Sequence, residues 1–138
     1  MERTTQLSRT QFKAEFTKRL VHFTVNTLKL CRSLREDRTL WEVANQVARS
    51  SASIGANVSE AKGSGSEKGY KNYFEIALKS ANETKYWFTV IAEFGVGNDE
   101  SFKNLENELN EIMKILTASI LTMKRRVDAK DVWCIKHS

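Results

Sequence analysis

The sequence RSSASIGANVSE, residues 49–60, combines small, apolar and polar side chains at helical spacing. Ala48, Ala52, Ala56 and Ser59 step by four, four and three residues, which places them on one side of a helix. Gly55 inside a helix costs about 1 kcal/mol relative to alanine, and close packing by another backbone would offset that cost. The stretch therefore predicts a helix whose small-residue strip lets a neighbouring helix come close.

A polar face runs beside this strip, because Arg49, Ser53 and Asn57 step by four and Glu60 follows three later. This face is either a solvated edge or a buried polar network that fixes the register of packed helices. Arg49 has Asn57 or a carboxylate of another helix, such as Glu83, as its expected partner. The predicted network comprises Arg49, Ser53, Asn57, Glu60, Ser80 and Glu83.

Apolar stripes on both sides of this stretch predict four helices, at about 10–34, 39–62, 66–94 and 99–127. Ser66 and Asp99 are suitable N-caps, and Gly95 suits the end of the third helix. Short connections imply an antiparallel up-down-up-down four-helix bundle, all-α, in one domain over residues 1–127. The tail, residues 128–138, carries Val132, Trp133 and Ile135, and is expected to be disordered or docked on something apolar.

Helix 10–34 has a second apolar strip, formed by Val21, Val25 and Leu28, about 100° from its main stripe. This strip is either part of a broad core face or a contact between subunits, so these three residues form the candidate oligomer interface. Tyr73 and Trp87 lie off the main seam of the third helix, where packing is a commoner role for an aromatic ring than stacking on a base.

Residues for catalysis or metal binding are sparse. His22 and His137 have no glutamate three residues before them, and Cys31 and Cys134 match no metal spacing. Gly63, Gly65 and Gly69 fit no phosphate-binding pattern. We expect no catalytic residue, metal, cofactor or small-molecule substrate, and a non-enzymatic protein. The two cysteines, the polar start and the lack of an 18-residue apolar run predict a reduced, cytoplasmic chain with no membrane contact.

The chain carries a net charge of +5, and residues 1–40 hold nine Lys/Arg against four Asp/Glu. An up-down bundle brings the start of its first helix, its second turn and the end of its fourth helix to one end. The cations gathered there are candidates for contacting a nucleic-acid backbone: Arg9, Lys13, Lys62, Lys68, Lys71, Lys124, Arg125 and Arg126. Ordinary solvated charge is the alternative.

The pattern Arg49-Ser50-x-x-Ser53-Ile54-x-x-Asn57-Val58-x-Glu60, followed by Phe74, Ala77, Ser80 and Glu83, resembles a known family. It is similar to the four-helix-bundle proteins encoded in 23S rRNA intervening sequences, the S23 family. That family is related to the accessory variability determinant of diversity-generating retroelements. The resemblance covers about residues 10–127.

The resemblance implies a ring-shaped homo-oligomer, a pentamer. Three functional hypotheses are open, of which the first follows from the resemblance. The first is a non-catalytic scaffold that binds RNA or DNA and assists a reverse transcriptase. The second is a protein–protein assembly module with no direct role for nucleic acid. The third is an enzyme that uses the polar network. Salt-dependent RNA binding separates the first from the second.

Overall fold

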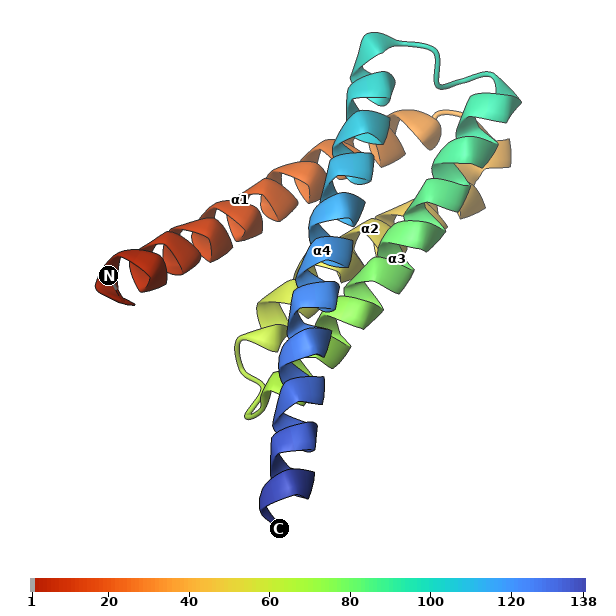
Figure 1. Ribbon diagram of the computed structural model, residues 1–138. Coiled ribbons are helices and arrows are strands. Elements are labelled where there is room, and N and C mark those ends of the chain that lie inside the picture. The colour runs from red at the N-terminus through yellow and green to blue at the C-terminus, as the bar shows by residue number, and fades with distance from the viewer. Residues whose placement is uncertain (1) are drawn as a thin grey trace.

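The computed structural model describes residues 2–138, with side chains from Thr10 onward, and within them the chain is all-helical. The helices are α1 (Glu2–Leu34), α2 (Trp41–Ala61), α3 (Glu67–Phe94) and α4 (Glu100–His137), with a short 3-10 turn, η1 (Arg38–Leu40), before α2. The chain turns back at each connection, so that consecutive helices pack side by side as a four-helix bundle (Figure 1).

The core follows the predicted apolar stripes. Its centre is aromatic, with the Phe88 ring 6.4 Å from that of Phe23 and 5.4 Å from that of Phe102, measured between centroids. These three rings come from α3, α1 and α4 and are almost completely buried. Other buried apolar side chains extend the core along the bundle: Phe16, Leu20, Leu34, Val47, Ile54, Val58, Phe74, Ile91, Leu109, Ile112 and Leu116.

The helix ends are fixed by the capping residues that the sequence predicts. The Ser66 hydroxyl accepts a hydrogen bond from the Gly69 backbone N–H at 3.0 Å, and the Asp99 carboxylate accepts one from Phe102 N–H at 3.0 Å. Gly95 ends α3 with φ of 95°, in the left-handed region that favours glycine. Each N-cap is worth about 1 kcal/mol, which helps to stop α3 and α4 from fraying at their starts.

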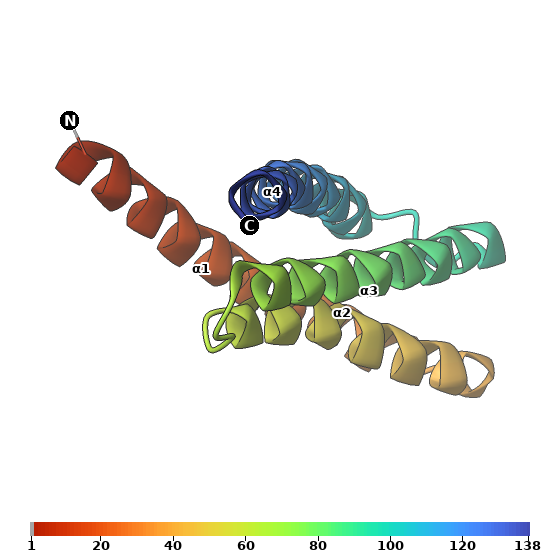
Figure 2. The same cartoon turned by 60° about the horizontal axis from the view of Figure 1, so that its bottom comes forward.

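The closest packing in the bundle lies between α2 and α3, where the facing side chains are short. Ala77, Ala81 and Thr84 of α3 are fully buried, and so are Ser50 and Ser51 of α2. In contrast, α1 leans away from α4 toward its N-terminal end (Figures 1 and 2). The bundle is therefore tight on one side and open on the other.

The small-residue strip is not the surface that packs closely. Ala52, Ala56 and Ser59 are exposed, because they point outward from α2. Gly55 does face α1: a Cβ added there would lie 3.5 Å from Leu20 Cβ and 3.9 Å from Thr24 Oγ1. The prediction of close approach therefore holds at Gly55 and fails for most of the strip.

The predicted end of the fourth helix needs a correction. The apolar stripe predicts an end at residue 127, but α4 continues to His137 because no glycine or proline follows Gly97. The tail is helical rather than disordered, and its apolar side chains are not packed on the bundle: Val132, Trp133 and Ile135 are 51, 62 and 76% exposed. The start also differs, since α1 begins at Glu2 rather than near Thr10.

Candidate nucleic-acid interface

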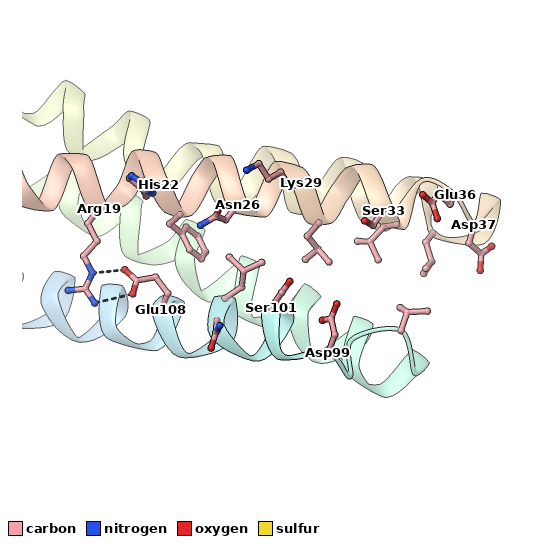
Figure 3. A pocket seen from close by; sticks show the side chains of 17 residues that line it. Arg19, His22, Asn26, Lys29, Ser33, Glu36, Asp37, Asp99, Ser101 and Glu108 are labelled. Atoms are coloured by element: carbon pink, nitrogen blue, oxygen red, sulfur yellow. Dashed lines mark hydrogen bonds and ion pairs between the residues drawn. The ribbon is translucent and has the colours of Figure 1, made fainter.

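A long groove separates α1 from α4, and a single ion pair bridges it among the side chains from Thr10 onward. Arg19 of α1 donates hydrogen bonds to both carboxylate oxygens of Glu108 of α4, one of them at 3.1 Å between Nη2 and Oε2 (Figure 3). The hydrogen bond with Glu108 raises the pKa of Arg19, and the charges of Glu108 and Glu111 add to this effect. The pair divides the groove into two compartments.

The polar compartment lies between this ion pair and the η1 end of the bundle, with a volume of about 940 Å³. Its floor is apolar, formed by residues such as Phe23, Leu34 and Leu105. Polar side chains from α1, the η1 turn and α4 surround that floor (Figure 3). They include four carboxylates, those of Glu36, Asp37, Asp99 and Glu108, so this compartment offers a poor surface to a phosphate.

The aromatic compartment lies on the other side of the ion pair, at the open end of the bundle, with a volume of about 800 Å³. Small and polar residues of α4, Ala118, Ser119 and Thr122, face α1 here and do not fill the space. Four aromatic rings line it. Phe12 and Phe16 of α1 stack with centroids 6.1 Å apart, and Tyr70 and Phe74 of α3 stack at 5.0 Å.

Three of the predicted nucleic-acid-binding residues line this aromatic compartment: Lys13, Lys62 and Arg126. Lys13 Nζ lies 5.1 Å from the centre of the Tyr70 ring, at cation–π distance. Burial raises the pKa of Tyr70, so the ring beneath this ammonium is a neutral phenol. One anionic residue, Glu67, is also part of the lining, and its carboxylate pairs with Lys130 at 3.2 Å.

The remaining predicted cations are distributed around the same end. Lys68, Lys124 and Arg125 are exposed but do not line the compartment. Lys71 pairs with Glu75 at 3.2 Å, which neutralises its charge locally. The side chain of Arg9 lies outside the described residues. Among the side chains that the structure describes, six of the predicted cations have no ion pair: Lys13, Lys62, Lys68, Lys124, Arg125 and Arg126.

The predicted polar network forms in part. Ser53 and Ser80 join α2 to α3 through their hydroxyls at 2.9 Å, and Asn57 Nδ2 donates to Ser53 Oγ at 3.0 Å. Sequence reasoning missed a second link, where Thr84 Oγ1 lies 2.9 Å from Ser50 Oγ and 2.8 Å from the Ser80 carbonyl oxygen. Both hydroxyls occupy positions in apolar stripes, a signal that could have marked them as buried.

The charged members of the predicted network lie outside it. Arg49 is exposed and donates to Gln46 on its own helix rather than to Asn57 or Glu83. Glu83 accepts a long hydrogen bond from Trp87 at 3.5 Å, and Glu60 is exposed. These three side chains point away from the α2–α3 contact, where only short side chains fit.

The outer face of α1 and α2 is a second surface of interest. Val21, Val25 and Leu28 are 57, 45 and 46% exposed, so they are not part of a broad core face. Val21 and Val25 each follow a residue that lies beside Gly55, and Ala56 follows Gly55. Ala52 and Ala56 of α2 are exposed as well, so both helices carry apolar side chains on solvent-facing positions.

Residue types for other chemistry are dispersed. Within the described part of the chain, no three histidine, cysteine or acidic residues come together as a metal site. Tyr73 and Trp87 are partly buried against the core, in packing roles. Cys31 is buried, which raises the pKa of its thiol, while Cys134 is exposed. In the same described part, no helix has the length and apolar content needed to cross a bilayer.

The fold and the groove between α1 and α4 define an all-helical bundle with one open end. The family model described as 23S rRNA-intervening sequence protein matches residues 13–118, and the chain belongs to that family. A crystal structure of a protein of unknown function from the S23 ribosomal protein family of Bacteroides thetaiotaomicron VPI-5482 is similar. It is 31% identical, with a TM-score of 0.72 over 76% of this chain and 97% of the other. None of the curated proteins matches this chain.

Proposed function

We propose that this protein is a non-catalytic, oligomeric scaffold that binds the backbone of RNA or DNA through the open end of its bundle. The observation that carries the proposal is the group of six cations at that end without an ion pair among the described side chains. Binding of such cations to phosphates releases counterions, which gives affinity without sequence preference. The proposal takes the bundle as antiparallel, so that residues 9–13, 62–71 and 124–126 share one end.

Assembly would multiply this charge. The family resemblance implies a cyclic pentamer, in which each subunit would contribute its own basic end to one particle. The exposed apolar strip of Val21, Val25 and Leu28, together with the exposed small residues of α2, supports a contact between subunits. A substitution of Val25 by glutamate should then break the assembly without unfolding the chain, because Val25 is outside the core.

A partner follows from the same resemblance. The relation of the family to the accessory variability determinant of diversity-generating retroelements makes a reverse transcriptase the partner to test, in the cytoplasm. Co-purification of the two proteins, with and without nuclease, separates a direct contact from one that RNA mediates. A protein–protein assembly module is the alternative, and the exposed strip on α1 favours it over an enzyme.

The test of nucleic-acid binding compares two triple variants that remove the same charge. One replaces Lys124, Arg125 and Arg126 by alanine at the open end. The other replaces Lys29, Arg32 and Lys103 by alanine at the opposite end, where all three side chains are also exposed. A mixed-sequence RNA and a mixed-sequence DNA are titrated against each protein at several salt concentrations, with circular dichroism as a check on helical content.

We expect the parent to bind with an affinity that falls log-linearly with salt. The open-end variant should bind more weakly and with a flatter slope. The slope should change by about 0.9 on duplex DNA, and by about 0.7 on a single strand, for each phosphate that the variant no longer neutralises. The opposite-end variant should keep the slope of the parent. Equal behaviour of the two variants, or no binding by the parent at low salt, would leave the protein–protein module as the better hypothesis.

A further inference from the structure

The aromatic compartment has features that binding to a phosphate backbone does not need. Phe12 continues the apolar stripe of α1, yet it is 52% exposed, in keeping with the divergence of α1 from α4 toward the N-terminal end of α1 (Figure 1). Its ring opens onto a groove of about 800 Å³ that also contains the Tyr70 ring. Pockets of roughly 300–1,000 Å³ hold drug-sized molecules, so planar rings of the size of a nucleobase fit here.

We propose that this compartment takes unpaired bases, which makes the protein a single-strand binder rather than a binder of any nucleic acid. The inference rests on the proposed function and adds a ligand class to the same end of the bundle. One or more bases would enter between α1 and α4 and stack on Phe12. Their phosphates would lie against Lys13, Lys62 and Arg126 at the rim.

The two aromatic pairs supply the stacking surface. The Phe12 and Phe16 rings are nearly parallel, with 14° between their planes, and the planes of Tyr70 and Phe74 differ by 23°. The outer member of each pair, Phe12 or Tyr70, is the more exposed, while Phe16 and Phe74 are buried beneath it. A base that stacked on Phe12 would continue an existing stack, whereas the Tyr70 ring already lies between Phe74 and the Lys13 ammonium. Such contacts tolerate any sequence, because every base has a π face.

The charges fit the same ligand. Lys62 and Arg126 have no ion pair among the described side chains, and Lys13 is held at the edge of the aromatic surface by Tyr70. Glu67 is the one acidic residue in the described lining, and Lys130 neutralises it. In the polar compartment, by contrast, four carboxylates face one lysine without an ion pair among the described side chains, Lys29, and only Glu108 of the four has an ion pair. A duplex would gain only the charge at the rim, since its paired bases are hidden inside its own stack.

Two substitutions of the same residue type form the core of the experiment. Phe12→Ala removes the outer ring of the compartment, and Phe94→Ala removes a phenylalanine that is 50% exposed at the far end of α3. Both rings are half exposed, so both variants should fold, and thermal melts check this. The probes are a mixed-sequence RNA strand, the same strand in a duplex, and an abasic strand of equal length. A further strand carries 2-aminopurine, whose fluorescence falls when it stacks.

We expect the parent to bind the strand more tightly than the duplex and to quench 2-aminopurine. Phe12→Ala should weaken binding of the strand by about five-fold or more and reduce the quenching. It should leave binding of the duplex and of the abasic strand unchanged. Phe94→Ala should match the parent on every probe.

The outcomes separate this inference from the proposed function. If strand and duplex bind equally, or if Phe12→Ala affects all probes alike, the base-stacking inference is overturned while backbone binding stands. If nothing binds at low salt, both fail together. The triple variant at residues 124–126 serves as the reference here, because it should weaken binding of all three ligands.

Discussion

The α2–α3 contact and the α1–α4 groove are both made by neighbouring helices of one bundle, yet their packing is opposite. Between α2 and α3 the facing side chains are short, and Ser53–Ser80 and Ser50–Thr84 bring the helices together through hydroxyls. Between α1 and α4 the long side chains of Arg19 and Glu108 meet across an open groove.

The difference shows how side-chain length assigns roles to the two sides. Short buried residues permit close backbones and leave no room for a ligand, so the α2–α3 side holds the fold. Long polar or aromatic residues with small ones opposite leave space, so the α1–α4 side is available for binding. Substitutions that lengthen or shorten side chains should therefore have unequal effects on the two sides.

The largest effect is expected from Ala81→Leu, because Ala81 is fully buried on α3. Overpacking a filled site should lower the free energy of unfolding by roughly 1–3 kcal/mol. Ala118→Leu makes the same change in the groove, where Ala118 is exposed, and should change stability by less than about 0.5 kcal/mol. Thermal and urea unfolding of the two variants measure the contrast. Equal losses would contradict the difference in packing.

Gly55 tests the contact between α1 and α2, which lies between these extremes. A Cβ there would meet Leu20 Cβ at 3.5 Å, an ordinary contact, whereas the longer side chain of leucine would collide with α1. Gly55→Leu should therefore cost roughly 1–3 kcal/mol. Gly55→Ala should instead stabilise the helix, by up to about 1 kcal/mol. The urea midpoints of the parent and the two variants measure these changes. A loss of stability in the alanine variant would show that only glycine fits at this position.

The hydroxyl contacts between α2 and α3 predict a smaller effect. Thr84→Val keeps the side-chain shape but removes the donor to the buried Ser50 hydroxyl, which retains only a long bond of 3.5 Å to the Val47 carbonyl oxygen, so it should cost about 1 kcal/mol. Thr89→Val is the matched control, since the Thr89 hydroxyl bonds the Lys85 carbonyl on an exposed face. We expect the control to stay within about 0.5 kcal/mol of the parent. A neutral Thr84→Val would mean that packing alone holds the two helices together.

Periodicity predicted most of the fold because burial follows from the stripe itself. The stripe of Phe16, Leu20 and Phe23 is buried as expected, and the caps at Ser66 and Asp99 begin their helices where turn chemistry placed them. Phe12 shows the limit of this reasoning. A stripe indicates which face avoids water, but it does not say whether a partner helix is close enough to cover that face.

The sequence predicted which charged residues come together at the candidate site, but it did not predict the shape of the groove there. The expected up-down order of the helices was enough to place Lys13, Lys62 and Arg126 together, and all three line one compartment. The groove between them depends on the angle between α1 and α4, which no local pattern encodes. For a similar reason, the sequence predicted the Ser53–Ser80 link of the polar network but wrongly added charged residues to it. Only short side chains such as those of Ser53 and Ser80 fit between α2 and α3. Residue spacing alone does not give the distance between the two helices, so it could not exclude the longer charged side chains.

The smallest effect is expected from the Arg19–Glu108 pair, although it is the one ion pair that bridges the groove among the described side chains. The side chains are 41 and 32% exposed, so water screens their attraction. A double-mutant cycle with Arg19→Ala and Glu108→Ala should give a coupling of about 0.2–1 kcal/mol.

Salt, rather than pH, is the useful variable for this ion pair. The pKa of Arg19 is raised on folding, so the stability that it contributes is fully present at neutral pH. That stability would be lost only as the pH rises through the folded pKa, far above the working range. Screening acts at any pH, since the Debye length falls from about 10 Å at 0.1 M salt to about 3 Å at 1 M. The coupling should therefore shrink at high salt, whereas the cost of Ala81→Leu should not. A coupling above about 2 kcal/mol that does not change with salt concentration would mean that the ion pair itself holds α1 against α4.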